Sequence, residues 1–163
     1  MSDESGHLKS HKLESMARKI NKNIPSLINK TSLRVRFSEV DSMQIVWHGE
    51  YVRYFEDGIE AFGREYSGLG YIDIYKSGFL TPIVKIVCDY KTPLTCGETA
   101  IIETRYINCE AAKILFEYTI YREADRQVVA TGESVQVFLN SNNQLELVNP
   151  EFYLEWKKKW GVK

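Results

Sequence analysis

Residues 34–66 read RVRFSEVDSMQIVWHGEYVRYFEDGIEAFGREY, and this stretch decides the fold. It opens with a predicted strand over residues 33–37, turns at Asp41 and leads through an apolar run into His48. Large apolar residues then recur every three or four positions, which predicts one apolar stripe along a helix. These residues are Tyr51, Tyr54, Phe55, Ile59, Phe62 and Tyr66. The remaining helix positions are mostly charged, so that face meets water or another chain.

The predicted helix ends at Ser67 and Gly68, because glycine readily takes the left-handed conformation that closes a helix. It therefore spans about 17 residues, or roughly 25 Å at a rise of about 1.5 Å per residue. Residues 71–82 follow without an apolar period. Because they carry Gly78 and Pro82, we expect them to be irregular.

The second half of the chain changes to a period of two, which predicts β-strands. Four such runs cover residues 84–90, 99–107, 113–122 and 128–139. The polar residues 123–126 form a tight turn between the last two runs, and we expect the four strands to be an antiparallel meander. Gly132 lies inside the last run, where a glycine marks a bulge or the close approach of another group.

This order of elements predicts an α+β fold, in which a curled antiparallel sheet of about five strands wraps around one long central helix. A single helix covers such a sheet only in part, and apolar residues remain at outer strand positions. Examples are Leu115, Tyr121, Val135 and Val137. We therefore expect two or more copies of the chain to pack together.

Two segments flank the predicted domain, which covers residues 31–148. Residues 1–30 are mildly basic and contain a short apolar helical face, so we expect a packed helical extension or a partly disordered tail. A basic arm for a membrane or nucleic acid is the alternative, but few charges support it. Residues 149–163 predict a C-terminal packing helix, with Asn149 as its cap and Pro150 at its first position.

The composition is that of an ordinary globular protein. At 163 residues and 44% apolar content, the chain can build one hydrophobic core. Its formal net charge of −1 gives no field that would draw it to nucleic acid or to a lipid surface. Cys88, Cys96 and Cys109 include no CxxC pair, which argues against disulfides and a zinc site. Without a transmembrane run or a signal peptide, we expect a cytoplasmic protein.

The candidate chemistry lies at the turn before the long helix. Asp41 can act on a group held at the helix N-terminus, where free N–H groups near His48 and Gly49 stabilise negative charge. These are the two requirements of acyl transfer, and Asp41 would activate water or attack the carbonyl itself. The alternative is structural, since turn aspartates often cap helices and histidines at helix starts are often polar surface. The sequence has no GxSxG motif, phosphate loop or metal-ligand cluster, so we expect no metal or bound cofactor.

Several segments also resemble a known family. FSEVDSMQIVWHGEYVRYFEDG, residues 37–58, is similar to the signature of hotdog-fold acyl-CoA thioesterases of the 4-hydroxybenzoyl-CoA thioesterase type, including the branch associated with the Tol-Pal system. The later segments PIVKIVCDYKTPLTCGETAIIETRY, ILFEYTIYR and VVATGESVQVFLN resemble the remaining strands of that family in the same order. The resemblance covers about residues 33–140. It implies the hotdog fold and hydrolysis of an acyl-CoA to a free acid and CoA.

The resemblance also implies roles for single residues. Asp41 takes the place of the catalytic carboxylate, acting as nucleophile or general base. His48 takes the position whose backbone N–H polarises the thioester carbonyl, and whose imidazole helps catalysis in the similar bacterial branch. Three residues depart from the family pattern: Gln44 stands where glycine is usual, Glu50 replaces an asparagine, and Phe37 replaces the tyrosine of the Tol-Pal-associated branch.

For the assembly, the resemblance implies a homodimer with the site between subunits, often paired into a homotetramer. The acyl pocket would be lined by Trp47, Gly49, Tyr51 and Phe55, although each aromatic residue taken alone could be plain core. Their bulk favours a short or aromatic acyl group. CoA would enter as part of the substrate, with its phosphates against lysines and arginines that the sequence does not identify.

Two alternatives remain open. One is an acyl-carrier-protein thioesterase, whose acidic carrier would dock on the basic tail or on the lysines at positions 157–159, unless these form an ordinary solvated helix end. The other is a non-catalytic acyl-CoA-binding or scaffold protein, which the departures at Gln44 and Glu50 favour.

Overall fold

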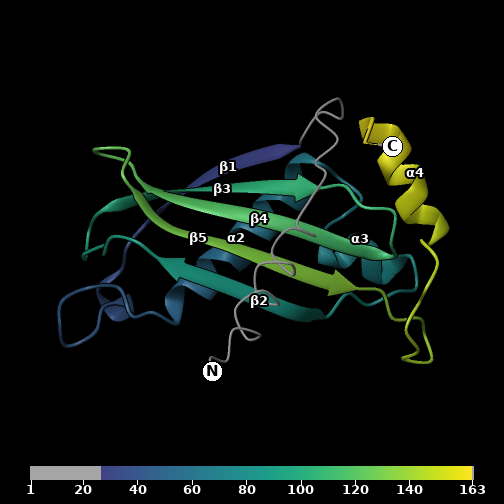
Figure 1. Ribbon diagram of the computed structural model, residues 1–163, viewed down its shortest axis with the longest axis horizontal. Coiled ribbons are helices and arrows are strands. Elements are labelled where there is room, and N and C mark those ends of the chain that lie inside the picture. Colours follow the sequence, from purple (N-terminus) through teal and green to yellow (C-terminus); the bar gives the residue numbers. More distant parts are fainter. Residues whose placement is uncertain (1–26, 163) are drawn as a thin grey trace, which may run out of the picture.

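The computed structural model describes residues 27–162, and Figure 1 shows their arrangement. The strands are β1 (Ile28–Arg34), β2 (Ile83–Tyr90), β3 (Thr99–Ile107), β4 (Lys113–Arg122) and β5 (Val128–Val137). The helices are α2 (Glu50–Glu65), α3 (Tyr71–Lys76) and α4 (Glu151–Trp160), and a short 3-10 helix, η1, covers Phe37–Glu39. The helical face predicted within the N-terminal extension lies outside the described residues.

The five strands form one antiparallel sheet in the order β1-β3-β4-β5-β2. With α2 on one face, this is the predicted α+β architecture. The expected meander of four strands is wrong at β2, because this strand pairs with β5 and not with β3. The connection from β2 to β3 crosses the end of the sheet, where the Val46 N–H donates to the Leu94 carbonyl at 2.8 Å. An apolar period of two predicts a strand but does not identify its neighbours.

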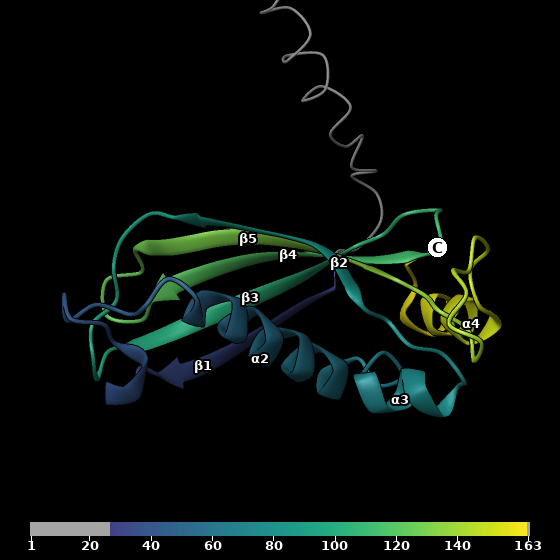
Figure 2. The same cartoon turned by 90° about the horizontal axis from the view of Figure 1, so that it is seen from below.

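Helix α2 crosses one face of the sheet (Figure 2). Its apolar side chains belong to the same core cluster as those of the strands. Phe55, Ile59 and Phe62 are each at most 3% exposed. The helix packs most closely on β1 and β3. Gly58 permits this approach, because a Cβ atom there would overlap the side chain of Thr104 on β3. Helix α2 therefore lies toward one side of the sheet, and the edge strand β2 is covered less.

The first strand differs from its prediction. It spans β1 rather than residues 33–37, and it begins inside the segment assigned to the N-terminal extension. Pairing with β3 fixes its position, since Ile28 lies opposite Arg105. Phe37 instead begins η1, where the Arg36 N–H donates to the Glu39 carboxylate at 2.8 Å. This contact between a side chain and the backbone ends the strand early.

The end of α2 follows its prediction, but the segment after it does not. Gly68 has a φ of +106°, the left-handed conformation expected where a glycine closes a helix. The segment 71–82, which was expected to be irregular, begins with α3. The Asp73 carboxylate accepts the Gly68 N–H at 3.1 Å and so joins the first turn of α3 to the end of α2.

The C-terminal helix α4 packs against the domain, as predicted. Tyr153 and Trp156 are each at most 3% exposed, and the hydroxyls of Tyr153 and Tyr106 lie 2.6 Å apart. The helix begins at Glu151, one residue later than predicted, because Pro150 is its cap residue and not its first residue. In Figure 1, α4 lies at the end of the sheet opposite the loop that leads into α2.

The face of the sheet opposite α2 carries none of the helices described for residues 27–162 (Figure 2). Its outer positions include Leu115, Tyr121, Val135 and Val137, which are all partly exposed. None of the helices in this range has both the length and the apolar content needed to cross a bilayer.

Candidate active site

A tight hairpin holds Asp41 just before α2. The Asp41 N–H donates to the Ile45 carbonyl at 2.9 Å, and the Gln44 N–H donates to the Asp41 carbonyl at 3.0 Å. One carboxylate oxygen, Oδ1, accepts the Met43 N–H at 2.7 Å. The other oxygen, Oδ2, has no hydrogen bond or ion pair with any residue of the described chain. Asp41 therefore stabilises its own turn with one oxygen, and the second oxygen is available for chemistry.

Gln44 has a left-handed backbone, with a φ of +64°. This is the conformation that closes a three-residue hairpin loop, and glycine adopts it with the least strain. The backbone at this position therefore keeps a conformation that suits glycine, although the residue is glutamine. The cost is local strain in the backbone of Gln44.

The chain enters α2 through Trp47, His48 and Gly49. The Trp47 N–H donates to the Glu39 carbonyl at 2.8 Å, and the Glu50 N–H donates to the Trp47 carbonyl at 2.9 Å. Between them, the N–H groups of His48 and Gly49 donate no hydrogen bond to any part of the chain that the structure describes. A Cβ atom on Gly49 would overlap the Trp47 ring, so the indole in its present position packs directly over Gly49. Two free amides at a helix N-terminus form a site that favours negative charge.

Tyr90, at the end of β2, fixes the entry to the helix. Its hydroxyl donates to the His48 carbonyl at 2.9 Å, and its ring lies edge-on to Tyr51 at 5.2 Å. Burial and the neighbouring Cys88 thiol raise the pKa of Tyr90 to about 12. The phenol therefore stays protonated at neutral pH and keeps its donor. The sequence did not identify Tyr90 as a site residue, although the alternation along β2 places it on the face toward α2.

An uncovered strip runs along β2 from this point. Ile86, Cys88 and Tyr90 pair with the inward-facing residues Ser134, Gly132 and Ala130 of β5. Since Ser134 and Ala130 are buried under α2, the three β2 residues face the same side of the sheet. Yet Ile86 is 37% and Tyr90 is 52% exposed. We call Ile86, Cys88 and Tyr90 the β2 strip; it is apolar, faces the helix side and is only partly covered.

The aromatic residues predicted to line an acyl pocket have two different environments. Trp47 is 46% exposed, whereas Tyr51 and Phe55 belong to the core, at 3% and 0%. The Phe55 ring stacks on Tyr118 with centroids 4.4 Å apart. It also lies directly on the backbone of β5, because a Cβ atom on Gly132 would overlap it. Gly132 therefore marks a close approach, which is one of its two predicted roles.

The other two departures from the family pattern lie on different sides of the site. Phe37 is 79% exposed in η1. Glu50 is buried, and its carboxylate lies 3.5 Å from the Arg53 guanidinium. It lines a cavity of about 690 Å³ between β1, η1 and the first turns of α2. Because three arginines and three carboxylates line this cavity, it has no excess of either charge.

The family model of the Thioesterase-like superfamily matches residues 35–157. The chain belongs to this superfamily. The protein named "Putative acyl-CoA thioesterase YneP" of Bacillus subtilis is 31% identical over 134 residues, which are 80% of this chain and 96% of that protein. The "Acyl-acyl carrier protein thioesterase ATL3, chloroplastic" of Arabidopsis thaliana is 23% identical over 116 residues, which are 71% of this chain and 60% of that protein.

Solved structures of the superfamily share the hotdog fold with this chain. The DHNA-CoA thioesterase from Staphylococcus aureus superimposes with a TM-score of 0.72 at 21% identity, over 81% of this chain and 89% of that one. The 4-hydroxybenzoyl-CoA thioesterase from Pseudomonas sp. strain CBS-3 gives 0.69 at 19% identity, over 79% and 98%. The predicted hotdog fold is confirmed, and the narrower assignment to the Tol-Pal-associated branch stays a prediction.

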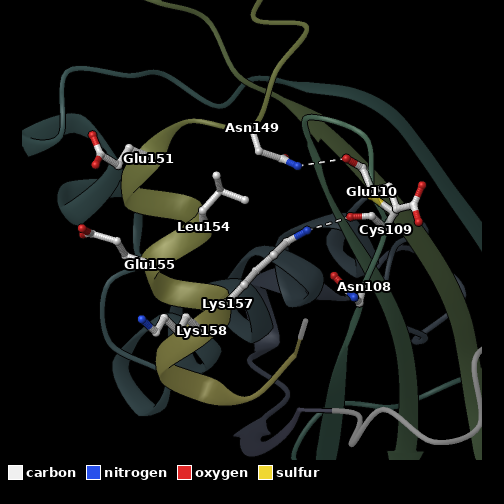
Figure 3. Close-up of a pocket in the computed structure, with 9 residues that line it drawn as sticks. All are labelled: Asn108, Cys109, Glu110, Asn149, Glu151, Leu154, Glu155, Lys157 and Lys158. Atoms are coloured by element: carbon white, nitrogen blue, oxygen red, sulfur yellow. Dashed lines mark hydrogen bonds between the residues drawn. The ribbon is translucent and has the colours of Figure 1, made fainter.

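A second cavity of this thioesterase-like chain, of about 600 Å³, lies beside α4 (Figure 3). Lys157 Nζ donates to the Cys109 carbonyl at 2.7 Å, and Asn149 Nδ2 donates to the Glu110 carbonyl at 2.9 Å. Both side chains thus tie α4 to the loop between β3 and β4. Burial lowers the pKa of Lys157. The polar groups of this cavity hold the helix in place.

The three C-terminal lysines do not form one exposed patch. Lys157 is only 6% exposed, and Lys159 Nζ donates to the Ser67 hydroxyl at 3.2 Å. This separation weakens the prediction that an acidic carrier protein docks on all three. Over the described part of the chain, there is no group of three or more His, Cys, Asp and Glu side chains placed to share a metal ion.

Proposed function

We propose that this protein is an acyl-CoA thioesterase that hydrolyses its substrate to a free acid and CoA. The observation that carries the proposal is the pair of free amides at His48 and Gly49, next to a hairpin that presents Asp41. A carboxylate and an oxyanion site are the two groups that hydrolysis of a thioester requires. Membership in the Thioesterase-like superfamily supports this reading of the geometry.

The amides act on the thioester carbonyl. As the carbonyl carbon becomes tetrahedral, its oxygen gains negative charge, and the N–H groups of His48 and Gly49 donate to it. A single donor of this kind is typically worth about a hundredfold or more in rate. Tyr90 keeps these amides in position, because its hydroxyl holds the His48 carbonyl on the other side of the same residue.

Asp41 promotes attack on the carbonyl carbon by one of two routes. As a general base, it removes a proton from water, the new hydroxide bonds to the carbonyl carbon, and the C–S bond breaks. As a nucleophile, its carboxylate forms an anhydride with the acyl group, and water then hydrolyses that anhydride. In both routes the thiolate of CoA leaves and takes up a proton. The imidazole of His48, which is exposed beside the site, can assist this proton transfer.

The acyl group lies along the β2 strip. Tyr90 begins the strip at the reactive centre, and Cys88 and Ile86 continue it as an apolar surface next to α2. Trp47, exposed at the helix start, covers the thioester from the other side. Tyr51 and Phe55 then support this surface from the core, and their bulk leaves little depth beneath the strip.

A homodimer completes the site. Strand β2 is eight residues long, stands at the edge of the sheet and carries exposed apolar side chains such as Val84 and Ile86. A long apolar edge of this kind is normally paired or covered. Pairing with a second copy would cover the strip and enclose the acyl group. Light scattering at micromolar concentration tests this, and a monomer would contradict it.

Two other functions remain as alternatives. An acyl-carrier-protein thioesterase is favoured by the similarity to the plant enzyme of that name. A non-catalytic acyl-CoA-binding protein was suggested by Gln44 and Glu50, but the left-handed backbone of Gln44 keeps a conformation that suits glycine and weakens that reading. Release of thiol from acyl-CoA, compared with release from the acyl carrier protein, separates the three.

The deciding experiment measures free thiol released from a panel of acyl-CoAs by the wild type and by Asp41→Asn. We expect the substitution to lower kcat by about a hundredfold or more, because a placed base typically supplies roughly 10² to 10⁴. Asp125→Asn is the matched control, since Asp125 also lies in a tight turn, between β4 and β5, and its carboxylate accepts the Gln127 N–H at 3.0 Å. Equal rates for the wild type and Asp41→Asn would remove Asp41 from the mechanism.

A further inference from the structure

A hydrogen-bonded bridge crosses from α2 to the sheet at the far end of the β2 strip. The Tyr71 hydroxyl, on α3, donates to Glu56 Oε2 at 2.9 Å. The same hydroxyl accepts Gln136 Nε2 at 3.0 Å, and Gln136 also donates to the Thr81 carbonyl at 3.4 Å. Three elements thus meet at one phenol: α2 through Glu56, α3 through Tyr71 and β5 through Gln136.

The register places this bridge directly beyond the strip. Gln136 pairs with Ile83 of β2, and the next inward pair along the sheet is Ser134 with Ile86, the last residue of the strip. At the other end, Tyr90 bonds to His48. An acyl group that starts at the reactive centre and follows the strip past Ile86 therefore meets the ring of Tyr71.

The bridge is firmly held. Gln136 is 2% exposed, so its amide has no freedom to turn away from Tyr71. The Tyr118 hydroxyl lies in the same region and is fixed to the Ser134 hydroxyl at 2.6 Å. Tyr71 itself is 39% exposed, which leaves its ring at the edge of the molecule rather than in the core. Tyr71→Ala therefore removes no core side chain, although the buried Gln136 amide then keeps only the Thr81 carbonyl as an acceptor.

We propose that Tyr71, held by Glu56 and Gln136, is the chain-length stop of the acyl site. This inference rests on the proposed function and specifies its substrate class: acyl groups short enough to end before Tyr71. Longer chains meet an aromatic ring and a carboxylate. Pushing an apolar chain between these groups would break two hydrogen bonds and leave buried polar atoms unpaired.

The open strip sets the reach of the site. From Tyr90 to Ile86 it covers about 13 Å at about 3.3 Å per residue. The bridge lies one inward pair further, because Gln136 pairs with Ile83, so Gln136 stands about 20 Å from the Tyr90 level along β5. On the helix side the bridge is nearer, since Glu56 lies about 12 Å from His48 along α2 at about 1.5 Å per residue. An extended chain of roughly ten carbon atoms fills the strip itself, so longer acyl groups approach Tyr71.

The test compares kcat/KM for butyryl-, octanoyl-, dodecanoyl- and palmitoyl-CoA, measured by release of free thiol. In the wild type we expect kcat/KM to fall about tenfold or more between octanoyl- and dodecanoyl-CoA. Tyr71→Ala removes the stop, and we expect the ratio of dodecanoyl- to butyryl-CoA activity to rise about tenfold or more, as misfits in acyl pockets typically change activity by about 10- to 200-fold.

Two variants control this result. Tyr75→Ala changes the same residue type on the same helix, but Tyr75 is 68% exposed and takes no part in the hydrogen bonds of the bridge. We expect it to change the activity ratio by less than about twofold. Tyr71→Phe keeps the ring and loses only the hydroxyl, so its ratio should shift less than that of Tyr71→Ala. Circular dichroism verifies that all variants are folded.

The outcomes separate the inference from the function. If Tyr71→Ala keeps the wild-type profile, if Tyr75→Ala shifts the profile equally, or if the wild type already prefers dodecanoyl-CoA, the stop is disproved while the thioesterase stands. If the wild type hydrolyses none of the four but releases thiol from an aromatic acyl-CoA, the stop is disproved while the thioesterase stands. If it releases thiol from no acyl-CoA of the panel, the proposed function itself fails, and the stop fails with it.

Discussion

The two ends of α2 use the same apolar stripe for different purposes. At the C-terminal end, Phe62 and Tyr66 are enclosed by aromatic rings from β3, β4 and α4, including Trp156. At the N-terminal end, Tyr51 packs on Tyr90, which is itself 52% exposed. The C-terminal end, called the sealed end below, is packed on all sides and contributes mainly to the stability of the fold. The other is incompletely covered, and it is the end that carries the free amides and the carboxylate.

The candidate site thus depends more on where α2 lies on the sheet than on the sequence of α2 itself. Gly58 draws the helix toward β3, and an apolar surface on the helix side stays partly open along β2. Substitutions at the sealed end should therefore affect folding, and those at the open end should affect turnover.

The largest expected effect lies at the sealed end. Phe62→Ala removes a ring that is 0% exposed and edge-on to Phe116 at 5.0 Å. We expect unfolding in urea to show a loss of about 3–5 kcal/mol, from lost burial and the cavity left behind. Activity per folded molecule should change by less than about twofold. A loss of turnover without a loss of stability would contradict the division between the two ends.

A smaller effect is expected where the middle of α2 packs on β5. Gly132→Ala would place a methyl group against the Phe55 ring and about 2.8 Å from the Val87 carbonyl oxygen, so the ring must shift. Overpacking of this kind costs about 1–3 kcal/mol. Gly70→Ala is the control, because its Cβ would meet nothing closer than the Asp73 carboxylate at 3.4 Å. Equal melting temperatures for the two variants would show that Gly132 is not needed for packing.

The open end should respond in turnover. Tyr90→Phe removes the hydroxyl that holds the His48 carbonyl, and we expect kcat/KM to fall about fivefold, which corresponds to one hydrogen bond of about 1 kcal/mol. Tyr75→Phe, at an exposed position on α3, should have no effect. Unchanged kcat/KM in Tyr90→Phe would mean that the helix entry is held without the phenol.

Tyr90 also predicts a dependence on pH. Its pKa is raised from 10.0 to about 12 in the folded protein, so the folded state keeps its proton where the unfolded state loses it. The stability linked to this group is fully present below pH 10 and is lost as the pH rises toward 12. The wild type should therefore lose more stability than Tyr90→Phe across this range, measured by urea unfolding.

The smallest effect concerns the hairpin. Gln44→Gly relieves the left-handed backbone and should stabilise the protein by about 0.5 kcal/mol, since released strain is partly offset by the entropy of glycine. Arg126→Gly is a matched control, because Arg126 has a φ of +61° in the turn between β4 and β5. Both should raise the melting temperature slightly, and neither should change kcat more than about twofold. A large loss of activity in Gln44→Gly would assign the Gln44 side chain a direct role.

The sequence predicted correctly those helices and strands that depend mainly on interactions between neighbouring residues. The bounds of β3 and β4 match the alternating runs, because strong alternation persists along strands that bury one face. Asp41 and His48 were found because a turn and a helix start lie seven positions apart in one segment. The prediction of the long helix was accurate for the same reason, as its stripe repeats over four turns.

What the sequence did not reveal depends on contacts between distant residues. Tyr90 and His48 are separated by 42 positions, and Gln136 and Tyr71 by 65. Nothing in the period of either segment indicates that their polar atoms meet. The predicted neighbour of β2 was wrong for the same reason, because the sequence does not show that β2 pairs with β5. Without this pairing, the sequence could not reveal the uncovered strip or the bridge at its end.

The place of β2 at the edge of the sheet also dictates the order in which the fold can form. Its partner is made late, since Cys88 pairs with Gly132, about 44 residues further along. At about 5–20 residues per second, a ribosome leaves β2 without its partner for several seconds. The hairpins β3-β4 and β4-β5 close locally, which is fast. The sheet is thus assembled from its middle outward, and the edge that carries the β2 strip joins after β5 has emerged.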